Sequence, residues 1–233
     1  MRWEDGGSVG KSNLEMESVK TYANVGKRSL APLPQGYYMA KRVIDFTLAF
    51  MALVLLSPVF LFLWIIYLFD HGPVLFKQKR YGKNGKVFYI YKFRSMVSDA
   101  EEVLKKDVLL YQRYLANNYK LEPHEDPRIT RIGRFLRKTS LDELPQLLNV
   151  LKGEMSLVGP RPIVDEELQQ YGDRKNHFLS VKPGMTGYWQ ISGRSAVGYP
   201  ERVDIELFYV YNQSLKLDMK IIFGTFGAVL KKR

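Results

Sequence analysis

One uninterrupted apolar segment constrains the fold of this chain more than any other feature. Residues 46–69 contain no Asp, Glu, Lys, Arg or His, so 24 consecutive positions lack a charged side chain. At about 1.5 Å of rise per residue, a helix of this length is about 36 Å long and exceeds the ~30 Å hydrocarbon core of a bilayer. Buried helices of soluble domains are usually shorter and keep a polar stripe. We therefore predict that this segment lies in a membrane.

Ser57 and Pro58 occupy the midpoint of the segment. Proline removes a backbone donor and disfavours the helical conformation of the residue before it, so a kink or break is expected here. Basic residues lie on both sides of the segment, at positions 27, 28, 41 and 42 and at positions 77, 79, 80, 83 and 86. Because positive residues mark the cytoplasmic side, a re-entrant helix hairpin over residues 37–72 satisfies both flanks. A proline-kinked spanning helix is the alternative, and the pattern weighs the two about equally.

The rest of the chain predicts an α+β, mostly helical fold. Residues 1–36 are rich in Gly, Ser, Asn, Lys and Glu without a sustained period, which indicates a mobile N-terminal tail. Residues 73–233 are expected to form a cytoplasmic domain. Within it, Asn84-Gly85 between two apolar runs predicts a small β-hairpin, and residues 99–119 have helical character.

A basic amphipathic helix is predicted around residue 130. Arginines recur at positions 128, 131, 134 and 137, while Ile129, Ile132 and Leu136 keep an apolar face. Such a helix is either a solvated surface helix or an interfacial helix at anionic lipid. The apolar stretches between residues 205 and 230 are too short to span a bilayer and suit packing or interfacial contact.

Composition and charge narrow the chemistry. The formal net charge is +11, which implies a polyanionic neighbour such as nucleic acid, acidic lipid or a phosphorylated substrate. There is no cysteine, which excludes disulfides, cysteine-ligated zinc and thiol catalysis. The three histidines are far apart in sequence, and neither a Walker motif nor a dinucleotide-binding glycine motif is present.

Two adjacent carboxylates, Asp142 and Glu143, stand closest to a recognisable chemical site. They follow Arg137 and precede Pro145, which suits the first turn of a helix. Carboxylates among cations at a helix start could bind Mg²⁺ while Arg137 and backbone donors hold a phosphate. The alternative is structural, because Ser140 and Glu143 have the spacing of a capping box.

Two further segments are candidates for ligand contact. Arg161 stands between Pro160 and Pro162, which would hold its guanidinium in a fixed place for a phosphate or a base. A plain turn after a strand is the alternative. The glycine-interrupted aromatic segment 182–190 could form a wall of a ligand pocket.

Taken together, five motifs in this order resemble the bacterial sugar transferase family, the polyprenyl-phosphate phosphoglycosyl transferases with a monotopic catalytic core. The motifs are Lys-Phe-Arg-Ser-Met at 92–96, Asp-Pro-Arg-Ile-Thr-Arg-Ile-Gly at 126–133, Arg-Lys-Thr-Ser-Leu-Asp-Glu-Leu-Pro-Gln at 137–146, Gly-Pro-Arg-Pro at 159–162 and Lys-Pro-Gly-Met-Thr-Gly at 182–187. The resemblance extends from about Lys41 to the C-terminus, which makes residues 73–233 the expected catalytic domain.

The resemblance implies transfer of a sugar-1-phosphate, expected to be a hexose-1-phosphate, from a UDP-sugar to undecaprenyl phosphate, with release of UMP. It implies that Asp142 is the nucleophile of a phosphoaspartyl intermediate and that Asp142 and Glu143 bind Mg²⁺. Substrate-binding roles follow for Arg137, for Pro160, Arg161 and Pro162, and for Arg80, Lys92, Arg94 and Asp218. The reaction would initiate polysaccharide or glycoconjugate assembly at the cytoplasmic face of a bacterial inner membrane, in contact with anionic lipids and without nucleic acid.

Two other functions are compatible with parts of the pattern. A membrane glycosyltransferase of the Leloir type would release UDP and form no covalent intermediate. A basic membrane-anchored protein could bind nucleic acid or acidic lipid without turnover, although the joint motifs argue against it. Galactose, glucose and an N-acetylated aminosugar all stay open, with galactose or glucose favoured, as does assembly into a homo-oligomer.

Overall fold

The computed structural model describes residues 32–69, 72–117, 121–192 and 197–230, so most of the predicted tail, residues 1–36, lies outside it. The fold is mostly helical with two small two-stranded sheets, as predicted. The elements are α2 (Gln35–Leu68), β1 (Leu75–Tyr81), η2 (Lys83–Gly85), β2 (Val87–Phe93), α3 (Ala100–Lys106), α4 (Val108–Ala116), α5 (Arg131–Thr139), η3 (Leu141–Glu143), α6 (Gln146–Lys152), β3 (Ser156–Val158), α7 (Asp165–Leu168), η4 (Gln169–Arg174), α8 (Lys175–Phe178), β4 (Gly184–Thr186), α9 (Tyr188–Ile191), α10 (Glu201–Tyr211) and α11 (Leu215–Leu230).

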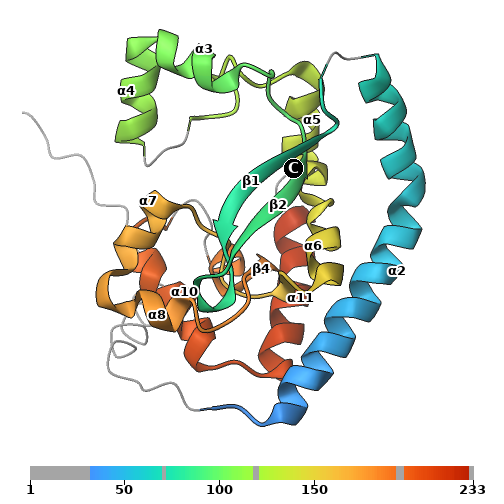
Figure 1. Ribbon diagram of the computed structural model, residues 1–233, viewed down its shortest axis with the longest axis vertical. Coiled ribbons are helices and arrows are strands. Elements are labelled where there is room, and N and C mark those ends of the chain that lie inside the picture. Colours follow the sequence, from blue (N-terminus) through green and yellow to red (C-terminus); the bar gives the residue numbers. More distant parts are fainter. Residues whose placement is uncertain (1–31, 70–71, 118–120, 193–196, 231–233) are drawn as a thin grey trace, which may run out of the picture.

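The apolar segment forms a single helix, α2, which continues through Pro58. The proline cannot donate to the carbonyl of Val54, but the Ser57 hydroxyl donates to that oxygen at 2.8 Å and replaces the missing bond. The expected separation into two half-helices is therefore absent from the structure. Figure 1 shows α2 as one continuous, gently bent helix along the side of the molecule.

The outward face of α2 is apolar over its whole length. It is the only helix in the described part of the chain that is long and apolar enough to cross a membrane. Its exposed large side chains are Tyr38, Met39, Val43, Phe46, Leu48, Phe50, Met51, Val54, Leu55, Leu61, Phe62, Trp64, Ile65 and Leu68. Water-soluble monomers seldom expose so large an apolar surface, so this face suits a lipid environment.

The inward face of α2 packs on the domain near both ends. Close to its N-terminus, the Arg42 guanidinium donates to the carbonyls of Val150 and Leu151 at 2.7 and 2.8 Å. Close to its C-terminus, the Tyr67 hydroxyl donates to the Arg94 carbonyl. Between these contacts, α2 covers two apolar clusters that contain side chains of β2, α5 and α6. The helix is thus joined to the domain along most of its length.

The predicted β-hairpin is confirmed. Strands β1 and β2 pair antiparallel from Leu75 opposite Phe93 to Tyr81 opposite Val87. Asn84 and Gly85 both adopt positive φ in the turn, at 59° and 73°, as expected for this dipeptide.

One helical prediction is confirmed and one needs correction. The helical character of residues 99–119 is confirmed by two helices, α3 and α4, which are separate because Asp107 leaves the helical conformation and its carboxylate caps α4 by accepting from the Leu110 amide. The basic helix begins only at Arg131, where Thr130 is the N-cap. Arg128 precedes it and is buried in an ion pair with Asp126 at 2.8 Å.

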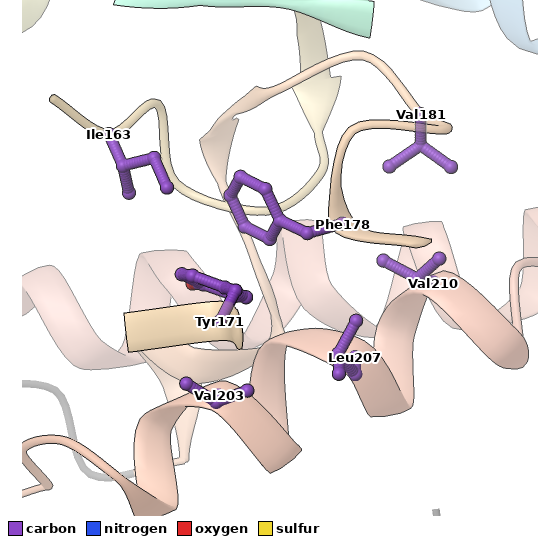
Figure 2. Packing of buried hydrophobic residues seen from close by; sticks show 7 residues of the cluster. All are labelled: Ile163, Tyr171, Phe178, Val181, Val203, Leu207 and Val210. Carbon is purple, nitrogen blue, oxygen red and sulfur yellow. The ribbon is translucent and has the colours of Figure 1, made fainter. Parts of the chain in front are cut away.

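A third apolar cluster surrounds α10, which the C-terminal pattern correctly predicted to pack. Figure 2 shows Val203, Leu207 and Val210 of this helix facing Phe178 and Ile163. Ile163 belongs to the loop after β3, so this cluster anchors the loop that carries Arg161.

Candidate active site

Asp142 and Glu143 lie in η3, the short turn that connects α5 to α6. The chain reaches this turn through Ser140, which ends α5 in the left-handed conformation at φ 58°. The predicted capping box is wrong, because the Ser140 side chain makes no cap hydrogen bond. Glu143 is engaged elsewhere, by Lys92 of β2, whose ammonium lies 2.8 Å from Glu143 Oε1.

Asp142 is buried and has no ion pair within the described residues. Burial and the neighbouring charge of Glu143 raise the pKa of the Asp142 carboxyl, while Lys92 and Arg137 act in the opposite direction. A partly desolvated carboxylate that makes no ion pair with the described side chains is available for reaction.

The packing of α5 fixes the position of the Arg137 side chain. A Cβ at Gly133 would lie 1.9 Å from the Ser95 carbonyl oxygen, so only glycine allows α5 to approach the segment after β2 so closely. At this contact, Arg137 Nε donates to Ser95 Oγ at 2.9 Å. The guanidinium is within electrostatic range of Asp142 and Glu143, which fits a phosphate-binding side chain beside the two carboxylates.

A cleft next to Glu143 gathers several of the predicted residues. It is lined by Arg80, Ile90, Lys92, Glu143, Gln146, Arg161, Pro162 and Met185. Four residues expected from sequence to bind substrate, Arg80, Lys92, Arg161 and Pro162, therefore come together, although they are up to 82 positions apart in the chain.

The cleft carries positive charge that the protein does not fully compensate. Arg80 is 8% exposed, and its Nε and one terminal nitrogen have no hydrogen-bond partner. Burial and the charge of Arg161 lower the pKa of Arg80 to about 10. Because buried donors are costly when unpaired, an anion in this cleft would relieve both the repulsion and the missing hydrogen bonds.

The loop with Pro160, Arg161 and Pro162 follows β3. It passes close to β4, because a Cβ at Gly184 would lie 2.1 Å from the Gly159 nitrogen. The two glycines thus permit the contact that places Met185 and Pro162 in the same cleft. The segment 182–190 contributes Met185 to the cleft, whereas Trp189 is buried and its ring stacks against Arg202 at 4.3 Å.

Arg94 and Asp218 lie outside the lining of this cleft. The Arg94 guanidinium lies over the Tyr67 ring of α2 at 5.5 Å. Asp218 is buried on α11, 2.9 Å from the Lys41 ammonium of α2 and 2.7 Å from the Tyr209 hydroxyl. Both residues connect α2 to the domain in this structure.

Sequence reasoning gave no role to Gln146 or Ile90, which complete the cleft. It also passed over Glu206, which is fully buried behind Arg161. The available signal was a carboxylate four residues after Arg202 with an apolar residue on each side of it, Ile205 and Leu207.

The fit of Mg²⁺ to these residues is partial. Within the described residues, no group of three or more His, Asp or Glu side chains converges as a metal site. Asp142 and Glu143 supply two hard oxygen donors, and Mg²⁺ commonly takes one or two carboxylates and completes its shell with water and substrate phosphates. The pair therefore suits a cation that arrives with a diphosphate.

Comparison with known proteins gives concordant matches. The family model described as bacterial sugar transferase matches residues 36–232. The undecaprenyl-phosphate galactose phosphotransferase of Salmonella typhimurium is 46% identical over 94% of this chain and 44% of its own length. The galactosyl transferase CpsE of Streptococcus agalactiae is 47% identical over 94% and 51%, and the exopolysaccharide production protein ExoY of Rhizobium meliloti is 46% identical over 84% and 87%. The chain thus spans about half the length of the first two.

Proposed function

Since the chain belongs to the bacterial sugar transferase family, we propose that it transfers a hexose-1-phosphate from a UDP-hexose to undecaprenyl phosphate and releases UMP. The observation that carries this proposal is the adjacent pair Asp142 and Glu143, of which Glu143 lines a cleft together with Arg80, Lys92 and Arg161. The names of two relatives, which refer to undecaprenyl phosphate, galactose and galactosyl transfer, support the acceptor class and favour galactose as the sugar. ExoY, named for exopolysaccharide production, supports a first step in polysaccharide assembly.

The proposed chemistry consists of two displacements at one phosphorus. First, a carboxylate oxygen of Asp142 forms a bond to the β-phosphorus of UDP-hexose, and the bond from that phosphorus to the bridging oxygen breaks. UMP leaves with the bridging oxygen. Second, a phosphate oxygen of undecaprenyl phosphate forms a bond to the same phosphorus, and the bond to Asp142 breaks, which regenerates the carboxylate.

The residues of the cleft and the nearby Arg137 would divide the remaining work. Arg161 and Arg80 would bind the nucleotide diphosphate, whose charge compensates their own. Arg137 would stabilise negative charge on the phosphoryl oxygens as the bond to Asp142 forms. Lys92 would hold Glu143 in place beside the reacting carboxylate.

The carboxylate pair would hold Mg²⁺ together with the donor phosphates. When bound, the cation would offset the repulsion between Asp142 and the incoming diphosphate. Excess EDTA should abolish turnover and added Mg²⁺ should restore it; full turnover in EDTA would remove the cation from the proposal.

The arrangement of α2 supports a monotopic protein, for which we propose the cytoplasmic face of a bacterial inner membrane. Both Arg42 and Tyr67 bond the same domain, so a helix that spans the bilayer would have to detach at one end. We propose that α2 inserts its apolar outer face into one leaflet as a single continuous helix and leaves both of its ends cytoplasmic. The exposed cations of α5 would contact anionic lipid headgroups.

The topology can be tested because the chain has no cysteine. Single cysteines at Ala40 and Lys83 should both resist an impermeant thiol reagent in intact cells and react after lysis. Labelling of the Ala40→Cys variant alone in intact cells would indicate a spanning helix.

The activity is tested directly by product identity. The purified protein in lipid nanodiscs is incubated with a panel of UDP-sugars and undecaprenyl phosphate, and the released nucleotide is identified. UMP release that requires one UDP-hexose and the lipid supports the proposal. UDP in place of UMP would indicate a Leloir-type transferase, and absence of turnover with every donor would overturn the proposal.

A further inference from the structure

The loop that presents Arg161 is held from behind by a buried charge network on α10. The Arg161 amide donates to both carboxylate oxygens of Glu206, at 3.3 and 3.2 Å. Three residues later, the Val164 amide donates to Glu167 at 3.4 Å. Two carboxylates from different helices thus fix the backbone of one short loop.

One guanidinium connects these two carboxylates. Arg202 Nε lies 3.5 Å from Glu206, and another Arg202 nitrogen lies 3.0 Å from Glu167. Arg202 is itself immobilised, with 2% of its surface exposed and its guanidinium carbon 4.3 Å from the Trp189 ring and 4.9 Å from the Tyr199 ring. A side chain enclosed in this way cannot move without disturbing both carboxylates.

The network would be costly if it served only stability. Glu206 is completely buried, and this burial raises the pKa of its carboxyl to about 7 in spite of Arg202 and Arg161. Two nitrogens of Arg202 lack a hydrogen bond of good geometry. Buried ion pairs often stabilise a protein less than apolar side chains of similar size, which favours a positional role here.

The loop has a third anchor between the two hydrogen-bonded amides. Ile163 is fully buried in the cluster around α10 (Figure 2), so the backbone from 161 to 164 is tied down on the side away from the cleft. The Arg161 side chain, in contrast, lines the cleft with Arg80 and Glu143. The direction of Arg161 therefore depends on the backbone that Glu206 holds.

We propose that Glu206 and Arg202 are positioning residues that fix the Pro160–Arg161–Pro162 loop for binding of the donor nucleotide. The inference rests on the proposed function for the identity of that ligand. Neither residue touches the reacting atoms. Their loss should weaken donor binding and leave the chemical step and the lipid acceptor largely unaffected.

The test compares carboxylate changes on one helix. Glu206→Met removes the acceptor at similar volume, Glu206→Gln restores a neutral acceptor, and Asp204→Asn is the matched control, because Asp204 pairs with Arg174 without contacting the loop. Amide exchange at Arg161 needs no substrate. We expect exchange at least about tenfold faster in Glu206→Met, partial rescue in Glu206→Gln and no change in Asp204→Asn, as fits loss of a hydrogen bond to a charged group.

Kinetics with the UDP-sugar accepted by the wild type supply the second measurement. The KM for the donor should rise about tenfold in Glu206→Met, with kcat and the KM for undecaprenyl phosphate within about twofold. Unchanged Arg161 exchange or donor KM in folded Glu206→Met would overturn the proposal, as would equal effects of Asp204→Asn. If Glu206→Met does not fold, Glu206→Gln is compared with Asp204→Asn: because its rescue is only partial, it should still show faster Arg161 exchange and a higher donor KM than the control, and equality of these two variants would overturn the proposal. A wild type without UMP release would end the proposed function, whereas amide exchange would still decide the role of Glu206.

Discussion

Asp142 and Asp218 are both buried aspartates, with 8% and 5% of their surfaces exposed, yet their surroundings differ sharply. Asp218 is paired with Lys41 and accepts hydrogen bonds from Tyr209 and Tyr37. Asp142 lacks an ion pair among the described residues, and burial raises the pKa of its carboxyl.

The difference distinguishes a structural carboxylate, Asp218, from a reactive carboxylate, Asp142. A carboxylate with all its partners in place is stabilised in the ground state and has little tendency to attack phosphorus. A desolvated carboxylate that no cationic side chain of the protein pairs with stays available to the substrate. On this comparison, Asp218 joins α2 to α11, and Asp142 carries the reaction.

The largest expected effect comes from Asp142→Asn. The amide keeps the shape and cannot form the phosphoaspartyl bond, so turnover should fall by about 10⁴-fold or more. Thermal stability should be unchanged or slightly higher, because the substitution removes a buried charge. Labelled UDP-hexose without acceptor should leave sugar phosphate on the wild type and none on the variant. Activity within tenfold of wild type would contradict the assignment of the nucleophile.

Asp218→Asn should show the reverse profile. It leaves the Lys41 ammonium without its partner at a site where that side chain is 14% exposed, and loss of one member of a buried pair costs about 3 kcal/mol. We expect a lower unfolding temperature with kcat within about threefold of wild type.

The matched control for this stability change is Asp165→Asn. Its ion pair with Lys79 is exposed, at 50% and 59% for the two side chains, so water screens it and its loss should change the unfolding temperature very little. Equal destabilisation by the two variants would contradict a structural role for the Asp218–Lys41 pair. Loss of turnover in folded Asp218→Asn would show that Asp218 is a substrate-binding residue.

Several features of the fold and the site could be predicted from the sequence, because each has a local physical cause. The β-hairpin followed from a dipeptide with a strong local conformational preference, and the apolar helix followed from length alone. The gathering of Arg80, Lys92 and Arg161 in one cleft agrees with the ligand that the motifs implied.

The errors arose where a tertiary contact decided a local choice. Ser140 and Glu143 have capping-box spacing, but Lys92 from a distant strand takes the Glu143 carboxylate. Arg128 has the helical period of its neighbours, but Asp126 holds it outside the helix. Pro58 predicts a kink or a break, and the helix is not broken there because the Ser57 hydroxyl donates to the carbonyl that lacks its usual donor. Glu206 accepts a hydrogen bond from the Arg161 amide, which is more than forty positions away in the sequence, so its role could not be predicted from its own helix.

A smaller effect is expected from Arg161→Lys, which keeps the charge of the cleft and loses the planar guanidinium. The KM for the UDP-sugar should rise about tenfold, because one bidentate contact becomes a single one. Arg174→Lys is the control, since Arg174 pairs with Asp204 on α10 and does not line the cleft. Unchanged kinetics in Arg161→Lys would show that Arg161 is only a turn residue and does not bind the donor through its guanidinium.

The smallest effect is a shift in the pH dependence of kcat/KM. The nucleophile must be ionised, so activity falls as pH decreases through the pKa of Asp142, and burial places that acid limb above the range of an ordinary aspartate. Lys92 lowers the same pKa, so Lys92→Met should move the limb to still higher pH, in addition to lowering the rate. Lys152→Met, which removes a cation stacked on Tyr91 outside the cleft, should leave the limb in place. A limb that moves to lower pH in Lys92→Met, or moves equally in both variants, would show that a group other than Asp142 controls the acid side of the profile.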